Sequence, residues 1–196
     1  MAVEFLTAQG PEILSWIPDA ARLRISVFRE YPYLYLGTMD YEQEYLRTYA
    51  ENPGSFFVIA RSGGRVVGVS TSVPLSEETE EVQRPFLQAG IPVSEVFYFG
   101  ESVLEPEMRG RGIGVRFMEE REANARRTEG IRRAVFCAVD RPDNHPLRPP
   151  VYVPLDDFWK RRGFTKTAMQ TQFTWQETDE AHATAKTLTF WEKHLA

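Results

Sequence analysis

The chain has 196 residues, of which 42% are hydrophobic and 26% charged, a composition typical of a soluble globular domain. Its net charge of −5 argues against a general nucleic-acid-binding protein, and its apolar runs are too short to cross a membrane. No signal peptide is recognised, so we expect a cytoplasmic protein with residues 1–196 in one domain. The single cysteine excludes an internal disulfide, and the scattered histidines lack zinc-binding spacing, so no metal is expected.

The first half of the chain alternates strand and helix patterns. Asp40 is expected to cap a helix, with Gln43 completing a capping box. The glycines at 63 and 64 favour a tight turn between two apolar runs. In chain order, the predicted elements are a strand at Val3–Ala8, a helix from Pro18 to near Tyr31, a helix from Asp40 to near Asn52, a hairpin of Phe56–Ala60 with Val66–Ser70, and a helix from about Glu77 to near Gly90.

The second half predicts three helices or loops set between further strands. In chain order, these are a strand at Val96–Leu104, a helix at Ile113–Glu129, a strand at Arg133–Val139, a proline-rich connection at Arg141–Pro154, a short helix at Leu155–Arg162, and strands at Phe164–Gln176 and Thr184–His194. This pattern predicts a mixed α/β fold with one central sheet and helices on both faces. The helix at 113–129 is expected to join two parallel strands.

The loop Arg109-Gly110-Arg111-Gly112-Ile113-Gly114 lies between a predicted strand and a predicted helix. Glycines allow a tight turn and a close approach of a ligand to backbone amides. A helix start adds unpaired N–H groups and a positive dipole end, which together favour phosphate. The loop therefore predicts a phosphorylated ligand, and two arginines can pair with its phosphate oxygens.

Two common phosphate-binding motifs are excluded by spacing. No Gly-Lys-Ser/Thr triplet occurs, so the loop is not a P-loop. The dinucleotide fingerprint needs a small residue where this chain has Val115 or Phe117. The remaining pattern, Arg-x-x-Gly-x-Gly between strand and helix, resembles the acetyl-CoA diphosphate loop of the GNAT superfamily of N-acetyltransferases. The Gly163-Phe164 pair and the order of elements extend this resemblance over nearly the whole chain.

The resemblance implies a sheet that splays on either side of bound acetyl-CoA. It assigns backbone contacts with the pantetheine arm to Ser102, Val103 and Leu104. It assigns contacts with the diphosphate to the residues of the glycine-rich loop, which are Arg109, Gly110, Arg111, Gly112, Ile113 and Gly114. Asn144 is the nearest match to an asparagine that touches the CoA arm in the family.

The chain departs from the family at the position of its usual catalytic tyrosine. Counting back from Phe164 gives Trp159, whose indole N–H cannot protonate a leaving thiolate as a phenol can. Either another group serves as this acid or water does; Tyr152 in the proline-rich connection is one candidate, and Tyr98 is another.

Acetyl transfer to an amine also requires removal of a proton from the acceptor. Glu101 is the first candidate base, because a carboxylate in the middle of an apolar strand is costly to bury without a function or a partner. Glu95 is the second. In a regular strand the two carboxylates would share a face, whereas a bulge at Gly100 would separate them.

Tyr31, Tyr33 and Tyr35 alternate in the segment that lines the acceptor pocket in the resembled family. Aromatic rings there can hold an amine by cation–π contact. The expected activity is transfer of an acetyl group from acetyl-CoA to a primary amine, and the proline-rich connection favours a small molecule. The alternatives are a non-catalytic acyl-CoA-binding module, acetylation of a protein amine, and a nucleotide in the same loop. A homodimer is expected by analogy alone.

Overall fold

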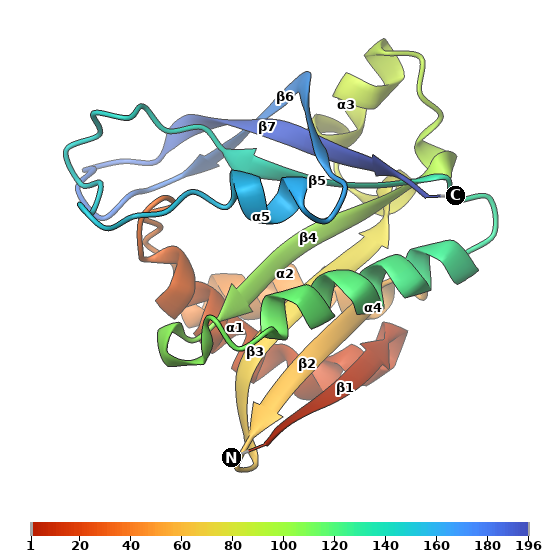
Figure 1. Cartoon of the computed structure of the whole chain (residues 1–196), viewed down its shortest axis with the longest axis horizontal. Coiled ribbons are helices and arrows are strands. Elements are labelled where there is room, and N and C mark those ends of the chain that lie inside the picture. Colours follow the sequence, from red (N-terminus) through yellow and green to blue (C-terminus); the bar gives the residue numbers. More distant parts are fainter. Residues whose placement is uncertain (1, 196) are drawn as a thin grey trace.

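The computed structural model describes residues 2–195. Seven strands form one mixed sheet in the order β1-β2-β3-β4-β5-β7-β6 (Figure 1). The strands are β1 (Val3–Gln9), β2 (Phe56–Ser62), β3 (Arg65–Pro74), β4 (Val96–Leu104), β5 (Arg133–Val139), β6 (Thr165–Trp175) and β7 (Thr184–His194). The helices are α1 (Ile17–Phe28), α2 (Met39–Glu51), α3 (Glu80–Gln88), α4 (Ile113–Arg127) and α5 (Asp156–Lys160), with 3₁₀ turns η1 (Gly10–Trp16), η2 (Leu75–Glu77), η3 (Val93–Glu95) and η4 (Pro106–Met108). The mixed α/β prediction is confirmed.

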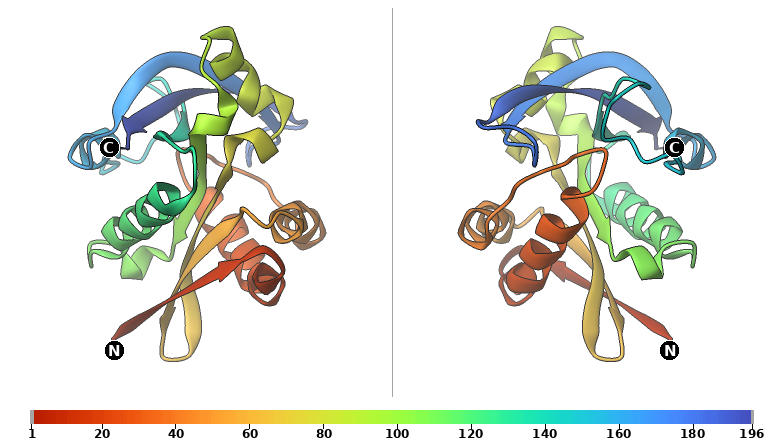
Figure 2. Two further views of the ribbon diagram at one scale, coloured as in Figure 1. Left: turned by 90° about the vertical axis from the view of Figure 1, so that its right-hand side faces the viewer. Right: turned by 90° about the vertical axis from the view of Figure 1, so that its left-hand side faces the viewer.

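Helices cover both faces of the sheet, as predicted. α1 and α2 lie on one face and α4 on the other (Figure 2). Leu23 of α1 and Leu46 of α2 are fully buried on the first face, while Phe117 of α4 and Trp191 of β7 are buried on the second. Apolar residues at helical spacing therefore supply both halves of the core.

The strands predicted at 96–104, 133–139 and 184–194 have those same bounds in the structure. The predicted cap of α2 was wrong. The helix begins at Met39, and the extended Thr38 occupies the cap position, so Asp40 lies in the first turn. Asp40 can therefore not form a capping box with Gln43, because that motif needs its first residue just outside the helix.

β4 and β5 separate partway along their length. Among the strand pairs of residues 2–195 they alone run parallel, and their pairing covers only residues 96–98 of β4 and 133–135 of β5. Beyond Tyr98, β4 continues beside β3 as far as Leu104, whereas β5 continues beside β7 to Val139. One edge of β4 is thus left without a strand partner from Phe99 onward, which gives the predicted splay.

A β-bulge lies in β4 where the two strands separate. Ser70 pairs with Ser102 and Ser72 with Phe99, so Thr71 alone faces the two residues Gly100 and Glu101. A bulge shifts the alternation of side chains by one position. Glu101 therefore points toward the α1 and α2 face rather than the α4 face.

Gly100 is required for this bulge to pack. A Cβ at this position would lie 2.6 Å from the Thr71 hydroxyl oxygen and 2.7 Å from the Tyr49 hydroxyl oxygen. Both oxygens belong to groups held in place, since Thr71 Oγ1 accepts the Glu101 N–H at 3.1 Å and Tyr49 is 4% exposed. The bulge and the packing of α2 against it are thus coupled through the missing side chain.

We predict that Gly100→Ala destabilises the protein by about 1–3 kcal/mol, the usual cost of overpacking a core. Urea unfolding measures this change. Because the bulge moves with the clash, turnover should fall as well. A variant as stable as the wild type would show that Tyr49 and Thr71 do not constrain the bulge.

Candidate active site

The glycine-rich loop adopts the conformation that its sequence predicts. Gly110 and Gly112 have positive φ angles of 75° and 80°, and Gly112 is the residue that precedes α4. Nothing lies within 4 Å of a Cβ built on either glycine. Ordinary residues adopt this backbone conformation only with strain, so the glycines both form the turn and leave space beside it.

The backbone amides of this loop remain available to a ligand. The first hydrogen bond of the α4 start is donated by the Arg116 N–H to the Gly112 carbonyl, at 3.1 Å. Within residues 2–195, no protein acceptor is found for the amides of residues 110–115. A helix start with several unpaired N–H groups is suited to an anion.

The two arginines of the loop differ in their surroundings. Arg109 donates to Glu30 at 2.9 Å and to the Leu104 carbonyl at 3.4 Å, so its guanidinium ties the loop to the segment after α1 and to β4. Arg111 is exposed. Arg111 is thus the better placed of the two to approach a phosphate.

The residues predicted to contact the CoA arm lie on the open edge of β4. Ser102 is exposed there, and its hydroxyl accepts a hydrogen bond from Arg121 at 2.8 Å. The side chain of Val103 is buried under α1 and α2, and Leu104 packs toward α4. What these residues offer to a ligand is therefore mainly their backbone.

Arg121 of α4 anchors the bulge from the other face of the sheet. Its guanidinium donates to the carbonyls of Thr71 at 3.2 Å and Glu101 at 3.3 Å, and lies 4.5 Å from the centre of the Phe99 ring. Burial lowers the pKa of Arg121 to about 9. A buried cation with these partners fixes the geometry of β3 and β4 at the bulge.

Glu101 lies in a buried ion-pair cluster on the α1 and α2 face. Arg24 of α1 contacts both Glu101 and Glu42 of α2, and Glu101 is 8% exposed. Burial acts to lower the pKa of Arg24, but the charges of the surrounding groups, led by Glu101, raise it well above its ordinary value. Arg24 therefore stays charged and holds the Glu101 carboxylate beside the bulge.

Glu95, the second candidate base, lies elsewhere. It belongs to η3, before β4 begins, and its carboxylate lies 3.5 Å from the Arg132 guanidinium. Six residues of extended chain, roughly 20 Å, separate it from Glu101. The bulge also places Glu101 on the opposite face from the one predicted by regular alternation from Glu95. The two carboxylates are not brought together.

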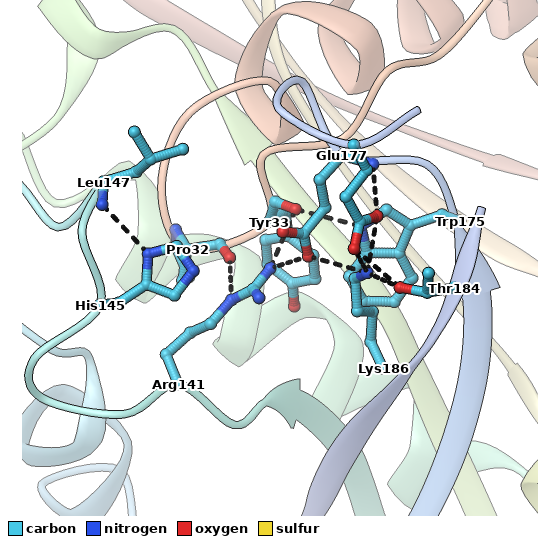
Figure 3. Close-up of polar contacts among 10 residues, drawn as sticks. Pro32, Tyr33, Arg141, His145, Leu147, Trp175, Glu177, Thr184 and Lys186 are labelled. Carbon is cyan, nitrogen blue, oxygen red and sulfur yellow. Dashed lines mark hydrogen bonds and ion pairs between the residues drawn. The ribbon is translucent and has the colours of Figure 1, made fainter. Parts of the chain in front are cut away.

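The three tyrosines after α1 do not form one surface, because Tyr31 and Tyr35 line two different cavities. The segment that carries them is fixed by Arg141, which donates to the carbonyls of Pro32 at 2.6 Å and Tyr33 at 3.2 Å, and by Trp175, which donates to Tyr33 at 3.1 Å (Figure 3). Tyr35 forms an isolated bridge with Glu177, beyond the end of β6. The α1–α2 segment is thus closed against the β6–β7 end of the sheet.

The Tyr33 ring packs between Phe28 and Trp175, with ring centres 4.7 Å and 6.1 Å away. Burial raises the pKa of its phenol, and the neighbouring Cys137, Tyr152 and Glu101 add to that effect. Tyr31 and Tyr152, but not Tyr33, line a cavity of about 420 Å³. Tyr35 lines a separate, smaller cavity of about 290 Å³.

The proline-rich connection forms one wall of the larger cavity. Tyr152 meets the Tyr31 ring edge-on at 4.7 Å, and burial raises the pKa of its phenol. Asn144 is exposed in the same connection. The acidic residues Asp140 and Asp156 also line the cavity, alongside Arg141 and two other basic residues.

Trp159 has a packing role in α5. Its ring lies 4.9 Å from Phe136 and 5.1 Å from Trp191, in the core on the α4 side. Tyr98, the other candidate acid, is buried at the separation of β4 and β5, with its hydroxyl 3.2 Å from the Cys137 sulfur. Cys137, the single cysteine, is buried, and burial raises the pKa of its thiol to about 12.

Sequence reasoning missed the residues that surround Glu101. Arg24 comes from α1, Glu42 and Tyr49 from α2, and Glu78 from the turn after η2, and only the fold brings them together. Arg121 carried a usable signal, because it lies four positions after Phe117 and three after Met118, on the buried stripe of α4. A charged residue at a core position of a helix indicates a buried partner.

Two kinds of site are not found in the described part of the chain. No group of three His, Cys, Asp or Glu side chains within residues 2–195 could hold a metal ion. In the same range, none of the helices has the length and apolar character of a membrane span.

Comparison with known proteins gives the family. Solved structures share the fold over the whole chain. An N-acetyltransferase from Staphylococcus aureus Mu50 is similar at 16% identity and a TM-score of 0.61, covering 100% of both chains. Arabidopsis thaliana NAA60, solved with a bisubstrate analogue, is similar at 14% identity and a TM-score of 0.63, again covering 100% of both chains.

A third similar structure, yncA from Salmonella typhimurium, was solved with its cofactor acetyl-CoA. It has 13% identity and a TM-score of 0.61, covering 100% of this chain and 95% of that one. No curated protein matches. The model of the acetyltransferase (GNAT) family matches residues 21–164. The chain therefore belongs to the GNAT family of acetyl-CoA-dependent N-acetyltransferases.

Proposed function

We propose that this enzyme transfers the acetyl group of acetyl-CoA to the primary amine of a small cationic molecule, by direct attack of the amine on the thioester. One observation carries the proposal. The bulge places Glu101 beside the open edge of β4, on the face of the sheet that α1 and α2 cover. A thioester held at that edge and an amine approaching from the α1 and α2 face would meet at Gly100 and Glu101.

The acetyl-CoA site consists of the loop amides and the edge of β4. The amides of residues 112–114 and Arg111 would hold the diphosphate, and the backbone of Ser102, Val103 and Leu104 would align the arm. Backbone N–H groups on the open edge of β4, which has no strand partner from Phe99 onward, would stabilise the oxyanion that develops at the acetyl carbonyl. When bound, acetyl-CoA supplies a reactive thioester, and proximity provides much of the rate.

The acceptor side favours a small molecule. The cavity of about 420 Å³ is walled by Tyr31, Tyr152 and Arg141, and the α1–α2 segment is closed against the β6–β7 end. A cavity of this size is typical of small-ligand sites. Tyr31 and Tyr33 would contact the amine by cation–π interaction.

Glu101 would attract the ammonium form of the acceptor to the bulge. Its ion pair with Arg24 favours this electrostatic role, because a proton taken up by Glu101 would leave the buried Arg24 less compensated. Tyr152 is the proposed acid for the leaving thiolate. Its raised pKa keeps the phenol protonated, as a proton donor requires.

Gly112→Val should lower the affinity for CoA by at least ~10-fold, because the valine side chain would enter the space beside the loop amides where the diphosphate is expected to bind. The matched control is Gly90→Val, since Gly90 also has a positive φ, of 70°, and open space around its Cβ. Both variants should carry a similar backbone strain of about 1–2 kcal/mol. Calorimetry with CoA and with ATP compares the two ligands. Normal CoA binding by Gly112→Val would disprove the loop assignment, and preferential ATP binding by the wild type would favour a nucleotide site.

A panel of amines tests the activity itself. Release of free thiol from acetyl-CoA should increase with small primary amines that carry a positive charge, and much less with peptides that present the same amine. If no amine accelerates thiol release from an enzyme that binds acetyl-CoA, the protein is a non-catalytic binding module. If only peptides do, the acceptor is a protein amine.

Glu101→Gln should lower kcat/KM by about 100-fold, because the ammonium then loses its counter-charge in a buried site. Glu119→Gln, on the exposed face of α4, is the control for loss of a surface carboxylate. Initial rates with the best amine of the panel measure the difference. Equal rates for the two variants would remove Glu101 from the acceptor site.

A further inference from the structure

A second carboxylate lies on the acceptor face, beside the bulge. Glu78 follows η2, in the connection from β3 to α3, and its carboxylate accepts a hydrogen bond from the Tyr49 hydroxyl at 3.4 Å. The same hydroxyl is the group that a Cβ on Gly100 would meet at 2.7 Å. Tyr49 Oη therefore touches both Glu78 and the bulge, so that one hydroxyl group separates this carboxylate from the proposed reaction centre.

The groups around Glu78 are acidic or neutral. From α2, the Tyr49 hydroxyl contacts Glu78, and the Tyr45 hydroxyl lies 3.1 Å from that of Tyr49. Glu101 and Tyr98 of β4 and Cys137 of β5 are close enough to interact electrostatically with Glu78. α3 contributes Gln83, which donates to the Glu78 carbonyl at 2.6 Å.

Glu78 differs from its neighbours in having no cation. Among the residues that the structure describes, the carboxylates of Glu42 and Glu101 both pair with Arg24, whereas no arginine or lysine forms an ion pair with Glu78. Burial and the charge of Glu101 raise the pKa of Glu78 to about 7, against smaller opposite effects of the Thr79 amide and the Tyr49 hydroxyl. A carboxylate in this state takes up and releases a proton near neutral pH.

The position of its backbone is fixed. The Gln83 side chain donates to the carbonyls of both Ser76 and Glu78, at 3.1 Å and 2.6 Å, and closes the turn on the start of α3. The Glu78 N–H donates to the Leu75 carbonyl at 3.1 Å. The side chain is thus presented to the bulge from a turn held on both sides, as a catalytic group requires.

We infer that Glu78 is the general base of this enzyme, while Glu101 holds the acceptor. This inference rests on the proposed acetyl transfer to an amine. The carboxylate of Glu78 takes one proton from the acceptor ammonium. The neutral nitrogen then forms a bond with the acetyl carbon as the carbon–sulfur bond breaks. Tyr152 gives its proton to the leaving thiolate, and the second proton released by the nitrogen restores the Tyr152 phenol. The products are the acetamide, free CoA thiol and one proton on Glu78, which passes to solvent before the next cycle.

Glu78→Gln tests the assignment, with Glu77→Gln as its control. The amide of Glu78→Gln keeps the size of the side chain and the hydrogen bond to Tyr49 but cannot take a proton, whereas Glu77 is the exposed neighbour in η2. kcat of the wild type and of Glu77→Gln should rise with pH through a midpoint near 7. For Glu78→Gln kcat should fall about 100-fold or more and lose that rise, with KM little changed, in the range expected for removal of a general base. Glu78→Asp should restore part of the rate together with the pH dependence.

Thermal unfolding distinguishes lost chemistry from lost structure. The pKa of Glu78 in the folded state exceeds its ordinary value of 4.5, so its contribution to stability is present below about pH 4.5 and is lost as the pH rises through 7. Glu78→Gln should therefore gain in Tm relative to the wild type more at pH 8 than at pH 5.

The outcomes separate this inference from the proposed function. If the wild type acetylates amines but Glu78→Gln keeps both its rate and its pH profile, Glu78 is not the base and the function stands. A variant that is slow but retains the pH midpoint near 7 also overturns the inference. If the wild type acetylates no amine, the proposed function and the assignment of Glu78 as its base both fail, and the Tm comparison then reports only whether the buried Glu78 carboxyl titrates near pH 7.

Discussion

The bulge in β4 is the constraint on which the site depends. One extra residue turns Glu101 toward α1 and α2, beside the point where β5 leaves β4. Three groups hold it: the Thr71 hydroxyl accepts the Glu101 N–H, Arg121 binds the carbonyls on either side, and Tyr49 occupies the space that a side chain at Gly100 would need. Without the bulge, Glu101 would face α4, and the acceptor face would lose its central carboxylate.

The electrostatics of that face follow from one cation among several acids. Arg24 compensates Glu42 and Glu101, and Glu78 remains without a cation in residues 2–195. Such an arrangement opposes folding, since buried carboxylates repel one another and lose hydration. Its retention in a well-packed core is typical of sites that need charge for function. The excess of negative charge suits an acceptor that arrives as an ammonium ion.

The sequence predicted what depends on local pattern. Continuous apolar runs predicted the strands at 96–104 and 133–139, and the glycines at 110 and 112 predicted the turn before α4. The predicted start of α2 was wrong. Asp40 and Thr38 both suit a cap position, but the extended backbone at Thr38 makes it the residue that precedes the helix. The bulge was foreseen as an alternative at Gly100, since a glycine within a strand often marks one.

The surroundings of Glu101 could not be predicted in this way. Arg24, Tyr49 and Glu78 are separated from it by 20 or more residues and come from three elements, so no periodicity or spacing links them. Trp159 showed the departure from the family's usual tyrosine, and the structure adds that its ring is used in the core beside Phe136 and Trp191. Long-range packing, not local pattern, determines which polar residues meet.

The most direct test of this account is a crystal structure of the enzyme with acetyl-CoA. The account predicts the diphosphate oxygens at roughly 3 Å from the amides of residues 112–114, and the thioester at the β4 edge beside Gly100 and Glu101. A diphosphate bound away from this loop, or a thioester on the far side of the sheet from Glu101, would contradict it.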